Sequence, residues 1–345
     1  MLRSFARSAV AAGSPLLFAA GACAGGSDAV GPSSSPECAV ATGGVQTTTV
    51  AGLTSWTIVP SVTDACITLE PDSHVVYRAA AGATSGRLFL FLNSTDEPVG
   101  SYHLILQQAA LAGYHAIGLA YPNDLPLSVG CATSGSCYGS ARLELLTGSP
   151  VSAVLSVDRA NSIEHRLARL LDFMARTDPA ANWRDYLIRD SSLSWGRISV
   201  AGHASGGAQA LFIAQRYDVW RATSYASYGD AIPNSLAVAS WITAPFATPT
   251  TRLFGLISTF DEIVSPSLTL AVWTSIGMGS ALVDVDITRL PYGTTQRFIS
   301  AAQPRNSAST FNANHNVIAV DRNTPRTQQA APAFAEVWRA ISFPP

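Results

Sequence analysis

Residues 198–208 read I-S-V-A-G-H-A-S-G-G-A, the pattern of a strand, a glycine-rich turn and the beginning of a helix. A turn of the form G-x-S-x-G exposes a serine hydroxyl at its apex, where an imidazole can remove its proton and make it a nucleophile. In this chain the apex position holds Ala204, and a serine follows at Ser205. Because a methyl group cannot attack a carbonyl carbon, the turn indicates a nucleophile site that lacks its usual nucleophile.

Two later residues stand where the partners of such a nucleophile are needed. Asp261 follows the apolar run 253–258, and His315 lies in a stretch of small and polar residues and is the only histidine after the turn. In nucleophilic catalysis an imidazole accepts the hydroxyl proton, and a carboxylate holds that imidazole in one tautomer. We therefore predict Asp261 as the orienting acid and His315 as the base. A turn-capping aspartate and a surface histidine are the structural alternatives.

Apolar runs and helical patterns alternate along the chain and define the elements that would position these residues. Strands are predicted at 74–79, 87–92, 116–121, 197–201, 222–227 and 253–258, and helices at 102–113, 160–176, 205–217 and 332–341. Strands that alternate with helices predict an α/β fold with a mainly parallel sheet covered on both faces. The short link between the first two strands predicts an antiparallel N-terminal edge. We expect the polar segment 122–158 to form a loop or cap over the carboxyl edge of the sheet, where ligands bind in such folds.

The turn and its surroundings resemble the α/β-hydrolase superfamily over residues 70–342, most closely an exported, lipoprotein-like bacterial branch whose turn reads G-H-S-Q-G-G. The same branch has Y-P-N and A-N-S-I-E stretches, found here at 121–123 and 160–164. The resemblance implies an α/β-hydrolase fold and the chain order nucleophile, acid, histidine. It also implies a serine at position 204 and an L-P-G-T-G loop, where this chain has L-N-S-T-D at 92–96.

The loop 92–98 is expected to form the second half of the site, because its backbone N–H groups would converge on a developing oxyanion. We predict that Asn93, Ser94, His203 and Ser205 surround the oxyanion or a bound ligand. Ser94 and Asp96 stand where the family has glycines, and a carboxylate at that place would oppose the build-up of negative charge.

Ser205 has alternative roles. It is expected to begin the helix and to donate its main-chain N–H to the oxyanion, with its side chain roughly a quarter to a third of a turn away from His315. Its hydroxyl could instead cap the helix or act as the nucleophile. The last role would place His203 where a glycine normally relieves crowding.

Composition excludes several other kinds of chemistry. The 345 residues are 48% hydrophobic and carry a formal net charge of −2, which predicts a globular chain without a basic surface for nucleic acid. The sequence contains no lysine, so phosphate-loop and Schiff-base chemistry are absent. Neither H-E-x-x-H nor C-x-x-C spacing occurs. We therefore predict no metal and no cofactor.

The N-terminal region predicts export. Residues 1–22 combine two arginines, a short apolar stretch and small residues, as a signal peptide does. Cys23 follows, and either it carries a lipid anchor or the chain is secreted without one. We expect a periplasmic, cell-surface or secreted protein that contacts a membrane only through that anchor. Residues 23–36 are expected to form a flexible tether, and 37–345 a single domain.

Four further cysteines suit an exported chain, because disulfides persist in oxidising compartments. Their spacing suggests that Cys131 pairs with Cys137 and that Cys38 pairs with Cys66, which would tie the N-terminal segment to the domain.

Three functional interpretations remain open. The first is a descendant of a serine hydrolase of esters or lipids with impaired or lost triad catalysis and a retained pocket for a small ester-like or apolar ligand. The second is an active esterase-like hydrolase that uses Ser205, His315 and Asp261. The third is a non-catalytic surface interaction module.

Overall fold

The computed structural model describes residues 38, 43–70, 72–80, 85–188, 192–232, 237–306 and 312–345. Within these residues, ten strands form one sheet in the order β1-β2-β3-β5-β4-β6-β7-β8-β10-β9. The strands are β1 Val45–Val50, β2 Leu53–Ile58, β3 His74–Ala79, β4 Leu88–Leu92, β5 His115–Leu119, β6 Ile198–His203, β7 Arg221–Tyr225, β8 Leu253–Ser258, β9 Leu282–Asp284 and β10 Arg297–Ser300.

The sheet is parallel from β5 to β9 and antiparallel from β1 to β3, where β3 pairs antiparallel with β5. This confirms the predicted α/β fold with a mainly parallel sheet and an antiparallel N-terminal edge. One detail of the prediction is wrong, because β3 and β4 are not neighbours. The edge is built from β3 and the hairpin β1–β2, and β5 inserts between β3 and β4.

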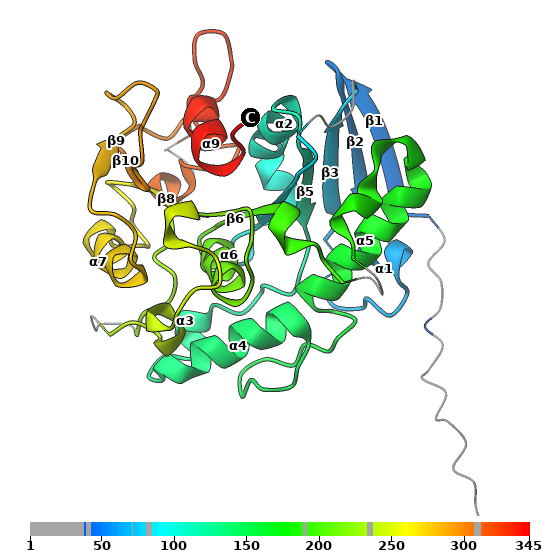
Figure 1. Ribbon diagram of the computed structural model, residues 1–345, viewed down its shortest axis with the longest axis horizontal. Helices are drawn as coiled ribbons and strands as arrows, with labels where there is room; N and C mark the ends of the chain where they lie inside the picture. The colour runs from blue at the N-terminus through cyan, green and yellow to red at the C-terminus, as the bar shows by residue number, and fades with distance from the viewer. Residues whose placement is uncertain are drawn as a thin grey trace, which may run out of the picture. The chain divides into compact units, whose positions relative to one another are not determined.

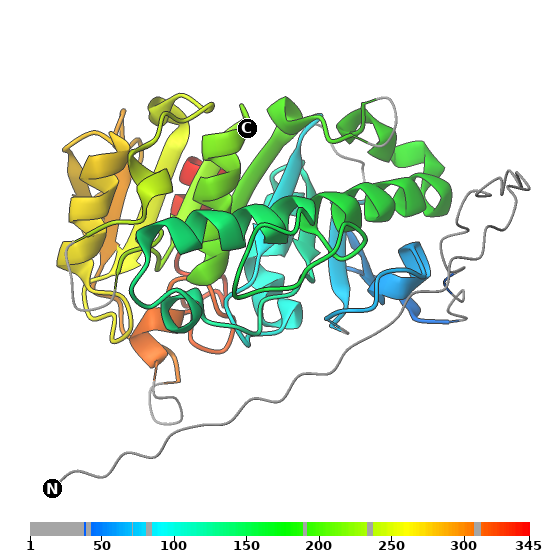
Figure 2. The same ribbon diagram turned by 90° about the horizontal axis from the view of Figure 1, so that it is seen from below.

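Helices cover both faces of the sheet. They are α1 Pro60–Thr63, α2 His103–Leu111, α3 Leu127–Gly130, α4 Gly135–Thr147, α5 Ile163–Thr177, α6 Ser205–Arg216, α7 Pro266–Ile276, α8 Ala313–Asn316 and α9 Ala335–Ser342. The helices α2 and α9 pack together on one face, and α4, α5 and α6 cover the other (Figure 1). Seen from below, α4 and α5 run across the front of the sheet (Figure 2).

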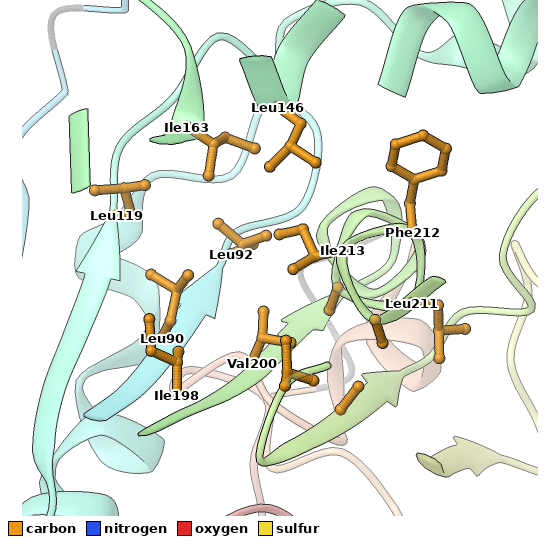
Figure 3. Close-up of a cluster of buried hydrophobic side chains, with 14 of the residues drawn as sticks. Leu90, Leu92, Leu119, Leu146, Ile163, Ile198, Val200, Leu211, Phe212 and Ile213 are labelled. Atoms are coloured by element: carbon orange, nitrogen blue, oxygen red, sulfur yellow. The ribbon is translucent and has the colours of Figure 1, made fainter. Parts of the chain in front are cut away.

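The apolar core under α4, α5 and α6 explains why the central strands are almost continuously hydrophobic. Leu90, Leu92 and Val200 point from β4 and β6 toward Leu146 and Ile213 on the helices (Figure 3). All five side chains are fully buried. At roughly 1.5–3 kcal/mol for each buried aliphatic side chain, this packing is a major part of what stabilises the sheet.

The segment 122–158 is more ordered than the sequence suggested. It contains α3 and the 13-residue helix α4, which packs against α5 and α6. Glu144 of α4 is buried and accepts hydrogen bonds from the main-chain N–H groups of Val151, Ser152 and Val157. The helix thus holds the following loop against itself.

Both suggested cysteine pairs are disulfide-bonded, Cys38 with Cys66 and Cys131 with Cys137. The second bond closes the short loop between α3 and the first turn of α4. The predicted signal peptide, Cys23 and the tether lie outside the described residues. Within the described part of the chain, no helix is long and apolar enough to cross a membrane.

A partly buried carboxylate, that of Asp321, gives the fold an expected pH dependence. Asp321 accepts a hydrogen bond from the Leu104 N–H, and burial raises the pKa of this carboxyl from its ordinary value of 3.8 to about 7. The unfolded carboxyl releases its proton at lower pH than the folded one, so stability falls as pH rises across that window. We expect Asp321→Asn to stabilise the protein by about 1–3 kcal/mol at about pH 8 and much less at about pH 4. Thermal unfolding at both pH values tests this, and an equal effect at both would contradict it.

Candidate active site at the carboxyl edge of the sheet

The turn between β6 and α6 has the backbone of a nucleophile elbow. Ala204 adopts φ 51° and ψ −116°, a conformation that costs a non-glycine residue on the order of 1–3 kcal/mol. The turn is possible because glycines allow close approach. A Cβ atom at Gly206 would lie 2.2 Å from the carbonyl oxygen of Leu92, and one at Gly202 would lie 2.2 Å from Gly206. This strained geometry places Ala204 in the wall of a large cavity.

Asp261 and His315 form a buried pair beside this turn. Asp261 lies just after β8 and His315 in α8, with side chains 0% and 4% exposed. Nδ1 of His315 lies 2.9 Å and 3.0 Å from the two carboxylate oxygens. Asp261 also accepts hydrogen bonds from the N–H groups of Ile263 and Val264. Because Nδ1 donates to the carboxylate, Nε2 of the neutral ring is left as an acceptor, and His315 lines the cavity.

Glu262 holds the loop that carries His315. Its carboxylate accepts hydrogen bonds from the main-chain N–H groups of Asn314 and His315 and from the Asn314 side chain. Burial opposes ionisation of this carboxyl, but these hydrogen bonds outweigh it and lower the pKa of Glu262. The two consecutive acids therefore fix both the ring and the backbone of His315.

His203 lies between His315 and the loop after β4 and is linked to both by hydrogen bonds. Its Nε2 donates to the carbonyl oxygen of His315, and its Nδ1 accepts from the hydroxyl of Tyr102. The same hydroxyl oxygen accepts the N–H of Ser94. Burial lowers the pKa of His203 well below its ordinary value, so the ring is neutral and makes one donor and one acceptor contact. His203 is completely buried and does not line the cavity, which corrects its predicted place around a ligand.

The hydroxyl of Ser205 is directed to a different partner from the one a nucleophile needs. Its Oγ donates to Oδ1 of Asn123 at 2.8 Å, and among the described residues no hydrogen bond joins it to His315. Asn123 is in turn held by its donation to the carbonyl oxygen of Asn93. Ser205 is the first residue of α6, and the N-cap position belongs to Ala204. The suggested capping role of the Ser205 hydroxyl is therefore not observed.

The loop after β4 contributes Ser94, Thr95 and Asp96 to the cavity wall. Asp96 is exposed and has φ 56°, in the left-handed region. An aspartate therefore adopts this backbone conformation where the resemblance implies a glycine. Asn93, predicted at the oxyanion or ligand, is buried and uses its amide to donate to the carbonyl oxygen of Glu97. It stabilises the loop from within and is absent from the described lining of this cavity.

The cavity has a volume of about 1190 Å³, which exceeds the roughly 300–1,000 Å³ of common small-molecule sites. Apolar side chains, among them Leu127, Val264 and Leu268, share its wall with Tyr138 and Tyr228. Part of this wall comes from the segment 122–158.

An ion pair that the sequence did not reveal lies in the same wall. Arg142 of α4 binds both carboxylate oxygens of Asp230, at 2.5 Å and 2.6 Å, and the two side chains are 2% and 5% exposed. Arg142 also donates to the carbonyl oxygen of Ser205, and Asp230 accepts the indole N–H of Trp241. The pair therefore ties α4 to the first residue of α6, directly behind the turn. Among the described residues, no cluster of histidine, cysteine or acidic side chains could hold a metal ion.

The strand order, the turn after β6, the acid after β8 and the histidine after β10 together give the chain the α/β-hydrolase fold. No protein-family model matches the sequence, and no curated protein matches it.

Solved structures with a similar arrangement include esterases. One is a cold-adapted esterase from an Arctic intertidal metagenomic library, 12% identical over 74% of this chain and 87% of that chain, with a TM-score of 0.38. Another is an acetyl xylan esterase from Paenibacillus sp. R4, 14% identical over 67% and 78%, with a TM-score of 0.36. A third is esterase B from Lactobacillus rhamnosis with a phosphonate inhibitor, 8% identical over 72% and 75%, with a TM-score of 0.41. At these scores the likenesses assign no activity to this chain.

Proposed function

We propose that this protein is an exported descendant of a serine hydrolase in which ordinary triad catalysis is impaired and the cavity binds a small ester-like or apolar ligand. One observation carries the proposal. The apex of a strained nucleophile elbow presents a methyl group, while the acid and the base of a triad remain paired beside it. Loss of a triad serine costs on the order of a million-fold in turnover in a serine protease.

The oxyanion side of the site supports the same proposal. Asp96 lies in the cavity wall, and its negative charge opposes the charge that develops on a carbonyl oxygen during ester cleavage. An active hydrolase gains from the opposite arrangement, with only N–H donors around that oxygen.

Use of Ser205 as the nucleophile is the alternative. The hydrogen bond from Ser205 to Asn123 favours the impaired site over this alternative, because nucleophile and base must lie within hydrogen-bond reach of each other. The third interpretation, an interaction surface without a ligand, gives no reason for a cavity lined by both apolar side chains and the Asp261–His315 pair.

Binding of an ester-like ligand tests the proposed function. We expect a medium-chain fatty acid and an alkyl aryl ketone, which resembles an ester but resists hydrolysis, to bind and raise the melting temperature. Ser128→Trp should weaken this binding at least about tenfold, because Ser128 is exposed and lines the cavity. The measurement is titration calorimetry with each ligand.

Val129→Trp is the matched control, since Val129 is 69% exposed and is not part of the described cavity lining. It should bind as the unchanged protein does. Absence of binding by the unchanged protein, or equal loss in both variants, would favour the interaction module.

A further inference from the structure

The Asp261 and His315 side chains are fixed by more hydrogen bonds than a pair without a function would need. The carboxylate is completely buried and receives hydrogen bonds from His315 and from two main-chain N–H groups. Burying a carboxylate is costly unless such partners compensate it. The ring is also fixed through the N–H and the carbonyl oxygen of its own residue, by Glu262 and His203. The imidazole is therefore held in one orientation, with Nδ1 at the carboxylate of Asp261 and the ring in the cavity wall.

Donors for an oxyanion are also retained. The first intrahelical hydrogen bond of α6 runs from the N–H of Ala208 to the carbonyl oxygen of Ala204. The N–H groups of Ser205, Gly206 and Gly207 thus lack helical acceptors, as at every helix start, and they lie at the positive end of a 12-residue helix. Ser205 adjoins Ala204 in the cavity wall, so its N–H is the expected donor to a carbonyl oxygen placed over the methyl group.

From this geometry we infer that His315 acts as a general base on a water molecule, so that the protein hydrolyses activated esters directly, without an acyl-enzyme. The inference rests on the proposed function, because it needs an ester bound in the same cavity. The short methyl group of Ala204 leaves the approach to the carbonyl carbon open to water, whereas a serine hydroxyl would occupy it.

The proposed hydrolysis has two steps. Nε2 of His315 takes one proton from water while the water oxygen forms a bond to the carbonyl carbon, and the carbonyl electron pair moves to oxygen, opposite the Ser205 N–H. The electron pair on that oxygen then re-forms the carbonyl, and the bond between the carbonyl carbon and the alcohol oxygen breaks. The alcohol oxygen takes the proton from His315. The products are a carboxylic acid and an alcohol, and the protein is unchanged. Asp96 lies in the same cavity wall, where we expect its carboxylate to disfavour an oxyanion, so esters with good leaving groups are the proposed substrate class.

Hydrolysis of p-nitrophenyl butyrate tests the inference. General base catalysis is typically worth 10²–10⁴-fold, so we expect His315→Ala to lower kcat/KM by on the order of 100-fold, and Asp261→Asn by on the order of tenfold or more. His165→Ala is the matched control, because His165 pairs with Asp64 away from the cavity and should leave the rate unchanged. We also expect a linear release of p-nitrophenol from the first turnover, and no acyl adduct in protein quenched with acid.

Other outcomes overturn the inference. A rate that is the same in His315→Ala means that the pair does not catalyse the reaction. A burst of p-nitrophenol with a butyryl group on Ser205 means that the serine route operates. Melting temperatures of the variants close to that of the unchanged protein show that lost activity is not lost folding. If the ketone still binds while no His315-dependent turnover is seen, this inference fails and the proposed ligand binding stands.

Discussion

Ala204→Ser is expected to raise the hydrolysis of p-nitrophenyl butyrate by on the order of 10³-fold or more, and the gain should depend on His315. The reason is that the substitution restores a hydroxyl at the apex of an elbow whose base and acid are already paired at 2.9 Å. A triad serine contributes up to about 10⁶-fold in a serine protease, but the altered loop after β4 should keep the gain below that limit. Steady-state kinetics measure the effect.

The double variant Ala204→Ser/His315→Ala is the control for this gain, and it should return to the level of His315→Ala alone. Adding Asp96→Gly to Ala204→Ser should raise the rate further, by about tenfold, since it removes a carboxylate from the cavity wall at a φ that glycine adopts freely. A gain that appears only when Asp96→Gly is added would mean that this carboxylate, as well as the missing hydroxyl, disables the site, and no gain in either variant would contradict the account.

Arg142→Met is expected to lower the free energy of unfolding by about 3–5 kcal/mol, because it leaves the buried carboxylate of Asp230 without its ionic partner. The pair is nearly inaccessible to solvent, so water cannot replace the lost guanidinium contacts. Urea unfolding at neutral pH measures the change. The double variant Arg142→Met/Asp230→Leu should recover most of the loss, since a buried ion pair replaced by apolar side chains is often tolerated.

An exposed pair provides the comparison. Arg176 binds Asp172 four residues away on α5, and its side chain is 60% exposed. Arg176→Met should therefore change stability by no more than about 0.5 kcal/mol. Similar losses at Arg142 and Arg176 would show that the pair behind the turn has no special structural role.

The sequence predicted the parts of the fold in which local pattern and burial agree. The strands β4, β5, β6 and β8 are mostly apolar because both of their faces are covered. The hairpin β1–β2 escaped prediction because β1, V-Q-T-T-T-V, is exposed throughout and has no buried face to leave a pattern. The helix α4 escaped because its buried residues include Arg142 and Glu144, so polar and apolar residues do not separate into two faces.

The residues of the candidate site also fall into those that the sequence located and those that it did not. The elbow and Asp261 could be located because each follows an apolar strand that has its own signal, and His315 could be located because it is the only histidine after the elbow. Asp230 and Arg142 carry no motif, and 88 residues separate them in the chain. The partner of Ser205 was equally hidden, since Asn123 was noticed only as part of a Y-P-N stretch. Such contacts depend on how α4 and the loop after β5 pack, and no local pattern encodes that packing.

Labelling with a fluorophosphonate, followed by mass spectrometry of the peptides, tests the central claim most directly. The reagent bonds covalently to a serine only when a neighbouring base activates its hydroxyl. We expect no adduct on the unchanged protein and an adduct at position 204 in Ala204→Ser. An adduct on Ser205 of the unchanged protein, lost in His315→Ala, would contradict the account and identify a working serine hydrolase.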